Sequence, residues 1–385
     1  MGSGFKSRGV YGRCTKGRSD ADRPFSVPGQ ASLDHERGIV DASRDGAATV
    51  SPSRRNPGID AVRVVAMLAV VAGHLWGAGL PRPLIYSWHV PVFFFISGVL
   101  WTPGRTMVSE LRSRALTLLV PYAAWVLIVL VAVVPVLVAR GEIPPPDLGA
   151  LLLGGRGPTT PFWTIWFVTA LFLAAVWMRL LERVPLPVRW GVAIVATLLV
   201  VVVAPAVLSR LPFSLGHSAV GLLYLLAGAG FARLRARSAL PWPWALVAVA
   251  VALLVAFLPG SGFDLKPLRL GLPVLGLIVS IVISAGLVVL GERALRRAPA
   301  WIATAVSRLA AASLVVLFVH VPLGFLLGVA GPNRTPLGFL LVAVLSWVLG
   351  LVLIAIPSTW PLTGSGAPVR SRGRAAAPPG PAAPR

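Results

Sequence analysis

The feature of this sequence that most constrains its fold is a series of apolar tracts long enough to cross a lipid bilayer. The tract GVAIVATLLVVVVAPAVL, residues 191–208, contains no charged residue, and a membrane-spanning helix needs about 20 predominantly apolar residues. Only 12% of the 385 residues are charged and 56% are hydrophobic, whereas soluble proteins carry about 25% charged residues. The chain is therefore predicted to be an all-α, polytopic transmembrane helical bundle.

The apolar tracts predict about ten spans. The second span contains Pro91, which removes a helix hydrogen bond, so we expect a kink or a partly re-entrant segment there. Loops after the even-numbered spans carry more arginine than the loops on the opposite side, and basic residues mark cytoplasmic loops. Both termini are therefore predicted to be cytoplasmic. The ten ranges are 59–80, 84–101, 115–139, 161–181, 188–208, 213–232, 240–258, 270–290, 310–330 and 337–356.

The two ends of the chain differ in composition from its apolar centre. Residues 1–57 and 358–385 are rich in basic residues, glycine and proline and show no hydrophobic period, which is typical of disordered segments. We expect them to be disordered basic cytoplasmic tails on either side of a transmembrane domain at 58–357. The net charge of +22 is attributed to tails and loops that face anionic membrane lipids. No nucleic-acid-binding motif occurs, so no nucleic-acid partner is predicted.

Metal and nucleotide cofactors find little support in the sequence. The chain has a single cysteine, which excludes an internal disulfide and a thiolate metal site. No group of histidine, cysteine and carboxylate residues has metal-ligand spacing, and phosphate-loop and dinucleotide-binding motifs are absent. We therefore expect no metal ion.

Ionisable residues interrupt the first predicted span. Arg63 and His74 lie eleven residues apart, which is about three helical turns and about 16 Å of rise, and they point to the same side. An ionisable group inside a span is costly and marks a candidate functional site. Asp60 lies about 20 Å from His74 along the helix, too far to orient it, and is expected to pair with Arg63. The alternatives are an interfacial ion pair that anchors the helix and, for His74, a structural hydrogen bond to a neighbouring helix.

Three further histidines lie in or near predicted spans. His89 begins the second span at the same end as His74, so the two imidazoles are predicted to be neighbours. His320 lies in the middle of the ninth span. His217 lies near the outer end of the sixth span and is interpreted as interfacial. Ser97 and Gly98, in the second span, are interpreted as small packing residues.

Five sequence blocks extend over most of the membrane region. They are NPGIDAVRVVAMLAVVAGH at 56–74, HVPVFFFISGVLW at 89–101, RALTLLVPYAAW at 114–125, FWTIWFVTALFL at 162–173 and SLVVLFVHVPLG at 313–324. Taken together and in this order, the blocks resemble the acyltransferase 3 family of integral-membrane acyltransferases. Members of this family O-acetylate bacterial cell-surface sugars and related acceptors.

The resemblance implies a function in a bacterial plasma membrane. An acyl group, most simply acetyl, would move from acyl-coenzyme A to a hydroxyl of a cell-surface glycan or another small hydroxylated acceptor outside the cytoplasm, as in polysaccharide O-acetylation. A neutral imidazole suits a general base that takes the proton of an acceptor hydroxyl, and this role is assigned to His74. His89 and His320 would orient the base or stabilise the oxyanion.

The resemblance also implies a donor site near the cytoplasmic side. Arg63, with its partner Asp60, and the loop residues Arg112 and Arg114 would bind the phosphates of acyl-coenzyme A. Many family members have an Arg-x-x-Arg pair in this loop. The two arginines here are separated by one residue instead, so neither can be matched individually to the family's pair.

Two other classes of protein fit the composition. A transporter would export a polysaccharide or lipid-linked glycan without covalent chemistry, but such proteins often contain internal repeats, and none is found here. An inactive scaffold in a polysaccharide assembly is the other class. The stretch with Trp163 and Trp166 would either stack on sugars or form part of an interfacial aromatic belt.

Overall fold

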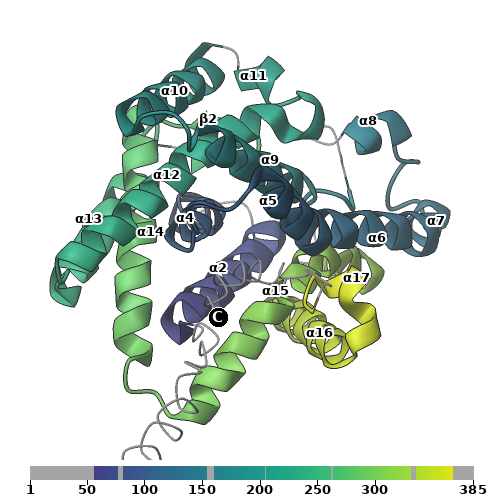
Figure 1. Ribbon diagram of the computed structural model, residues 1–385. Coiled ribbons are helices and arrows are strands. Elements are labelled where there is room, and N and C mark those ends of the chain that lie inside the picture. The colour runs from purple at the N-terminus through teal and green to yellow at the C-terminus, as the bar shows by residue number, and fades with distance from the viewer. Residues whose placement is uncertain are drawn as a thin grey trace, which may run out of the picture. The chain divides into compact units, whose positions relative to one another are not determined.

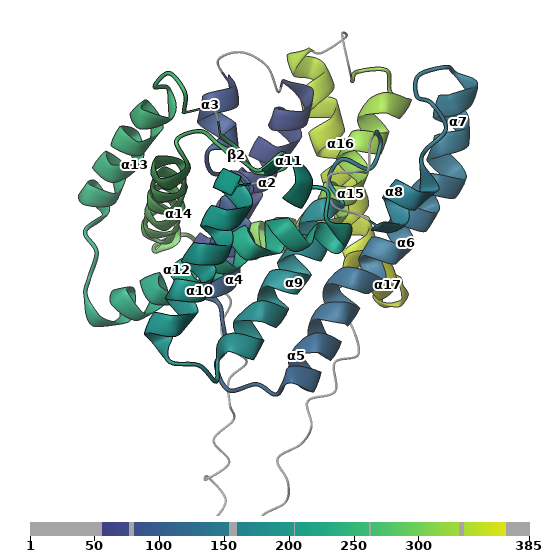
Figure 2. The same cartoon turned by 90° about the horizontal axis from the view of Figure 1, so that it is seen from above.

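The structure is a computed structural model that describes residues 56–76, 81–153, 160–203, 205–261, 263–330 and 335–366. Helices make up most of these residues, as two views at right angles show (Figure 1 and Figure 2). The disorder predicted for the outer parts of both tails lies outside the described residues. The longer helices are α2 (Pro57–Leu75), α9 (Trp166–Leu181), α10 (Leu186–Leu198), α12 (Leu215–Arg237), α13 (Trp242–Ala256), α14 (Pro273–Leu295), α15 (Ala300–Leu326) and α16 (Pro336–Ala355).

Shorter elements connect these helices. Two π-helical turns, Ala115–Leu119 and Val129–Val133, join α5, α6 and α7 into one long rod, and a third, Leu199–Val203, extends α10. A two-stranded antiparallel hairpin of β1 (Phe263–Asp264) and β2 (Arg269–Leu270) lies between α13 and α14. The shorter helices are α3 (Pro81–Tyr86), α4 (Pro91–Val99), α5 (Met107–Arg114), α6 (Val120–Ile128), α7 (Val134–Ala139), α8 (Leu148–Leu153), α11 (Pro205–Leu208) and α17 (Trp360–Thr363).

The all-α membrane bundle predicted from composition is confirmed. Among the described residues, seven helical segments are long and apolar enough to cross a membrane, and α9 and α13 are shorter but also apolar. Every predicted span contains at least one described helix, although the second is divided between α3 and α4. The count of ten spans and the cytoplasmic position of the termini stay predictions.

The second predicted span is broken rather than continuous. α3 ends at Tyr86, a turn follows, and α4 begins at Pro91. Proline has no N–H to donate and a fixed φ angle, so it suits the first turn of a helix and disrupts a helix interior. The expected interruption at Pro91 is therefore confirmed, and the turn before it carries His89 into the bundle.

The outward faces of several helices are apolar. On α13, Leu246, Val251 and Leu254 are exposed, and on α16 Leu337 and Leu340 are exposed. Water would disfavour so many large apolar side chains on one surface, whereas lipid tails are as apolar as leucine. These faces are suited to contact lipid.

Close approach of α4 and α12 depends on two glycines. A Cβ at Gly98 would lie 2.0 Å from the carbonyl oxygen of Leu225, and a Cβ at Gly228 would lie 2.0 Å from that of Phe95. Any larger residue at either position would force the two backbones apart. The interpretation of Gly98 as a packing residue is confirmed.

Helix α2 occupies the interior of the bundle, between α4, α14 and α15 (Figure 1). Ala66 and Val71, near its middle, are fully buried. Its N-terminus is capped by Asn56, whose side chain accepts hydrogen bonds from two backbone N–H groups and donates to Glu292 of α14 at 2.6 Å. The N-terminus of α2 is thus attached to α14.

The ordered fold extends past the domain boundary predicted at residue 357. The short helix α17 packs against α6, where the indole Nε1 of Trp125 donates a hydrogen bond to the carbonyl oxygen of Leu362 at 2.8 Å. Described residues continue to Ser365 and Gly366. Low hydrophobicity after residue 357 concealed this contact, because it uses a backbone carbonyl rather than an apolar side chain.

Candidate active site

Two histidines on different helices contact each other inside the bundle. His74 lies in the last turn of α2 and His320 in the second half of α15, and their nitrogens Nδ1 and Nε2 are 2.8 Å apart. His320 is buried, whereas His74 is only partly buried. A hydrogen bond between helices is what a purely structural His74 would need, so its function depends on what the rest of the ring faces.

The hydrogen-bond partners assign the protons of this pair. Nδ1 of His320 lies 2.7 Å from the carbonyl oxygen of Val316, and a carbonyl only accepts, so this nitrogen carries the proton. In a neutral His320, Nε2 is then an acceptor and receives a hydrogen bond from the Nδ1–H of His74. A neutral His74 is left with a lone pair on Nε2, which is the arrangement of a base.

His74 lines a cavity of about 420 Å³, a volume within the range of about 300–1,000 Å³ typical of small-molecule sites. The cavity lies between the end of α2, the turn before α4, the start of α9 and the β1–β2 hairpin. Its polar and aromatic lining comes from widely separated parts of the sequence and includes His74, His89, Trp163, Trp166, Asp264 and Lys266.

His89 faces the same cavity, as predicted from its position near His74. Its Nδ1 donates to the carbonyl oxygen of Ile85 at 2.8 Å, so a neutral ring has an acceptor at Nε2. The ring packs edge-on against Tyr86, with centroids 4.9 Å apart, and the hydroxyl of Tyr86 donates to the carbonyl oxygen of Gly73 on α2. These bonds attach α3 and the turn to the end of α2.

The two tryptophans that precede and begin α9 line the cavity together. Trp163 lies 6.3 Å from the His74 ring, centroid to centroid. Trp166 is buried, at 5% exposure, and packs on the ring of His217 at 4.7 Å. A buried Trp166 does not fit an interfacial aromatic belt, whereas both rings offer apolar faces to the cavity.

The β1–β2 hairpin forms another wall of the cavity, and several hydrogen bonds fix its position. Asp264 accepts from Arg82 at 2.6 Å and from the backbone N–H of Lys266 at 3.1 Å. His217 Nε2 donates to the carbonyl oxygen of Lys266 at 2.8 Å. Burial raises the pKa of the Asp264 carboxyl above its ordinary value, although the positive charge of Arg82 opposes the change.

The interpretation of His217 as interfacial is wrong. Its side chain is fully buried, because the hairpin covers the start of α12 and Trp166 of α9 packs against the ring. The sequence places His217 near a helix end but gives no sign that a loop about fifty residues later folds over it.

Asp60 and Arg63 form the ion pair predicted from their spacing, with Nη1 and Oδ1 3.2 Å apart. Asp60 is 5% exposed and its other oxygen accepts from Ser307 of α15 at 2.8 Å. Arg63 keeps about a third of its side chain exposed, 35%. The pair therefore lies at the beginning of α2, at the opposite end from His74.

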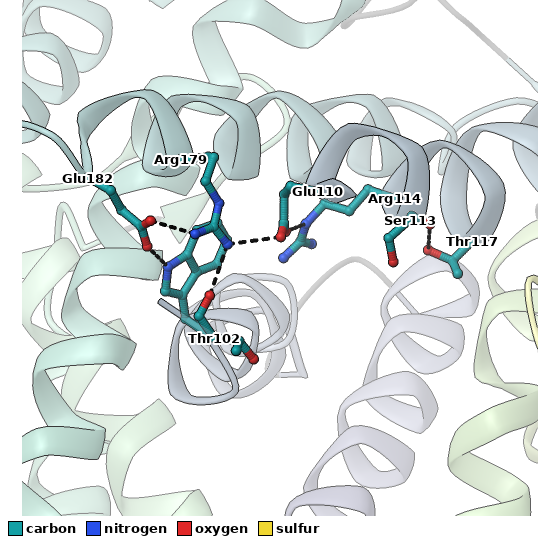
Figure 3. Close-up of polar contacts among 8 residues, drawn as sticks. Thr102, Glu110, Ser113, Arg114, Thr117, Arg179 and Glu182 are labelled. Carbon is teal, nitrogen blue, oxygen red and sulfur yellow. Dashed lines mark hydrogen bonds and ion pairs between the residues drawn. The ribbon is translucent and has the colours of Figure 1, made fainter. Parts of the chain in front are cut away.

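A second cluster of charges lies where α5 and α9 meet (Figure 3). Glu110 is buried and accepts from Arg114 at 2.5 Å and from Arg179 at 2.9 Å. Arg179, also buried, bonds Glu182 at 2.5 Å, and its guanidinium lies 4.3 Å from the ring centre of Trp101. This cluster binds the first helix of the long rod to the last turn of α9.

The structure does not bring Arg112 and Arg114 together on one face. They are two residues apart on α5, which turns them about 200° from each other. Arg114 is occupied by Glu110, whereas Arg112 is exposed. Sequence reasoning missed the structural role of Arg179 and counted it as a loop arginine. The nearby Glu182 was the one sequence feature that indicated an ion pair, because the chain has only 13 acidic residues.

Within the described part of the chain, no group of three or more histidine, cysteine, aspartate or glutamate residues is placed to hold a metal ion.

A family model described as an acyltransferase domain matches residues 56–356 of the chain. This range includes every residue of the cavity and of both charge clusters. No curated protein and no solved structure matches the chain. The chain belongs to the acyltransferase 3 family and is a multi-pass membrane acyltransferase.

Proposed function

We propose that the protein transfers an acyl group from acyl-coenzyme A to a hydroxyl of a glycan or related acceptor outside the cytoplasm, with His74 as the general base. The observation that carries this proposal is the hydrogen bond from His74 to His320 at the wall of the cavity. It fixes the imidazole while leaving Nε2 unprotonated. On one side of the His74 ring lies the buried His320, whose two ring nitrogens are both hydrogen-bonded, and on the other side lies the cavity. A general base needs both a fixed orientation and access to its substrate.

The proposed reaction needs only this base and the two substrates. Nε2 of His74 takes the proton of the acceptor hydroxyl as the hydroxyl oxygen attacks the thioester carbonyl. The tetrahedral intermediate collapses, the carbon–sulfur bond breaks, and the thiolate of coenzyme A receives the proton from His74. The products are the acyl ester and free coenzyme A, and the base returns to its starting state.

The histidine partners have different proposed roles. Both ring nitrogens of His320 are engaged with protein groups, by Val316 and by His74, so this residue orients the base. A neutral His89 presents an acceptor nitrogen, which suits a hydrogen bond from the acceptor hydroxyl better than stabilisation of an oxyanion. The expectation of oxyanion stabilisation is therefore not carried forward for either residue.

The donor is proposed to approach from the end of the bundle that carries Arg63. We assign the donor phosphates to this partly exposed arginine, which Asp60 orients, and to the exposed Arg112. Arg114 is given a structural role instead, because its guanidinium forms an ion pair with Glu110. Arg63 and His74 lie about 16 Å apart along α2, so the pantetheine arm would run beside this helix.

The acceptor is proposed to occupy the cavity from the opposite side, against Trp163 and Trp166. Flat aromatic faces pack well against the apolar faces of sugar rings. With the predicted cytoplasmic termini, this side faces away from the cytoplasm, and a bacterial plasma membrane is the proposed location. An acetyl donor and a polysaccharide acceptor are the simplest substrates.

The test is acyl transfer per folded molecule in membranes that contain the protein, with labelled acetyl-coenzyme A. His74→Gln keeps the size and hydrogen-bonding capacity of the side chain but has no basic nitrogen. We expect transfer to fall by about 10²–10⁴-fold, the usual contribution of general-base catalysis, at an unchanged amount of folded protein. A Gln variant with near-normal turnover would remove His74 from the chemistry and favour a transporter or scaffold.

A further inference from the structure

We propose that the cavity selects acceptors that carry an anionic group near the reacting hydroxyl, and that Lys266 recognises this group. Lys266 lines the cavity together with His74 and His89. It belongs to the β1–β2 hairpin, which contributes one wall of the cavity. The inference deepens the proposed function and rests on it, since it assigns a charge preference to the acceptor side of the same cavity.

The hairpin is a fixed wall and not a loose loop. Leu265, Leu268 and Leu270 are each exposed by 3% or less and belong to the apolar core shared by α9 and α12. The backbone of Lys266 is bonded on both sides, through its N–H to Asp264 and through its carbonyl oxygen to His217. A lysine on such a wall is positioned with little freedom in its backbone, which favours specific recognition.

The charge balance of the cavity wall favours an anion. Asp264 also lines the cavity, but one of its oxygens accepts from Arg82 and the other from the N–H of Lys266. The positive charges of Arg82 and Lys266 both act on this carboxylate, so two basic groups face one acid at this wall. Lys266 lines the cavity and gives the wall a net positive charge. A carboxylate or phosphate beside the acceptor hydroxyl would meet this charge.

The ligand class follows from this chemistry. An anionic oxygen group within a monosaccharide's length of the reacting hydroxyl occurs in a uronic acid and in a sugar phosphate. A cavity of about 420 Å³ holds a single sugar unit with part of a thioester. The shared requirement is an anionic oxygen, and two matched pairs of probes distinguish its source.

The experiment measures protection of His74 from diethyl pyrocarbonate, which acylates unprotonated imidazole nitrogens, by mass analysis of the His74 peptide in membrane-embedded full-length protein. The probes are methyl β-glucuronide against methyl β-glucoside and glucose 6-phosphate against glucose. Each pair differs in its anionic group at the sixth carbon. We expect half-protection at about tenfold lower concentration for the anionic member, the effect of one charge-assisted hydrogen bond.

Variants of the same hairpin provide the controls. Lys266→Glu should reverse the preference, Lys266→Met should abolish it, and Lys266→Arg should keep it. If the Glu variant fails to fold, the Met variant still tests whether the preference depends on the charge of Lys266. Arg269→Glu makes the same change of charge on the same hairpin at an exposed position outside the cavity lining. It should leave the preference unaltered, because solvent screens an exposed charge outside the lining.

The outcomes separate this inference from the proposed reaction. Equal protection by both members of each pair, or an Arg269→Glu effect as large as that of Lys266→Glu, would overturn the inference. A preference confined to the glucuronide or to the phosphate supports it and identifies the anion. If labelled acetyl is never transferred while the charge preference persists, the reaction fails and the anion site stands. A transfer rate that falls equally for all acceptors in Lys266→Met, with no change in protection, would give Lys266 a role in oxyanion stabilisation instead.

Discussion

His74 donates a hydrogen bond to His320 across 2.8 Å, and the two residues lie on helices that run in the same direction. The direction follows from a second contact between the same helices, from Ser307 to Asp60 at 2.8 Å. Fourteen residues separate Asp60 from His74 and thirteen separate Ser307 from His320, a rise of about 20 Å on each helix. These two hydrogen bonds, at equal spacing on α2 and α15, form a frame that holds His74 in position.

This frame predicts that His320 acts on the reaction only through His74. His320→Ala should lower kcat by about 10- to 100-fold, an effect typical of a lost partner that orients a functional group, with little change in KM for acetyl-coenzyme A. His320→Gln offers an amide oxygen to Nδ1 of His74 and should recover part of the loss. Steady-state kinetics on equal amounts of folded protein measure both. A Gln variant as impaired as the Ala variant would contradict the orienting role.

The sequence was sufficient for the local part of this arrangement. The spacing of Asp60, Arg63 and His74 is a property of one helix, so their positions and the ion pair followed from helical geometry alone. The hairpin wall was not predictable, because Asp264 and Lys266 lie about 190 residues from His74 in sequence and only packing brings them to it. Glu110 and Arg179 were missed for the same reason, since their bond joins positions 69 residues apart.

The two arginines of α5 should behave differently when removed. Arg112→Ala is expected to weaken binding of acetyl-coenzyme A without loss of folded protein, because this side chain is exposed. Arg114→Ala should lower the free energy of unfolding by about 1–3 kcal/mol, because the buried carboxylate of Glu110 loses one of its two arginine partners. Calorimetric binding and thermal denaturation in detergent distinguish the two. Equal effects of both variants on binding, with unchanged stability, would return Arg114 to the donor site.

The topology is testable at two loops. A reporter inserted after Arg237, at the end of α12, should be cytoplasmic, and one inserted at Pro259, after α13, should be external. The reason is the excess of arginine in the loops after even-numbered spans. Paired alkaline phosphatase and fluorescent-protein fusions measure the side of each loop. Two cytoplasmic results would break the ten-span order at α13.

Asp264 should make stability fall as the pH rises. Burial raises the pKa of its carboxyl in the folded chain, so between the unfolded and the folded pKa the folded state binds more protons and is favoured by acid. The advantage is complete below the ordinary pKa of about 3.9 and is lost as the pH rises through the raised value. Asparagine cannot ionise, so Asp264→Asn should be more heat-stable than the unmodified protein at neutral pH.

The pH series decides whether burial or the ion pair with Arg82 dominates at Asp264. Melting temperatures in detergent between about pH 4 and pH 8 should show the gain from Asp264→Asn shrinking toward acid, as the native carboxyl becomes neutral too. Arg82→Gln removes the charge that opposes the raised pKa, so the gain from Asp264→Asn should be larger in that background. If Asp264→Asn instead lowers the melting temperature at neutral pH, the attraction between Arg82 and Asp264 at 2.6 Å exceeds the cost of burying the carboxylate.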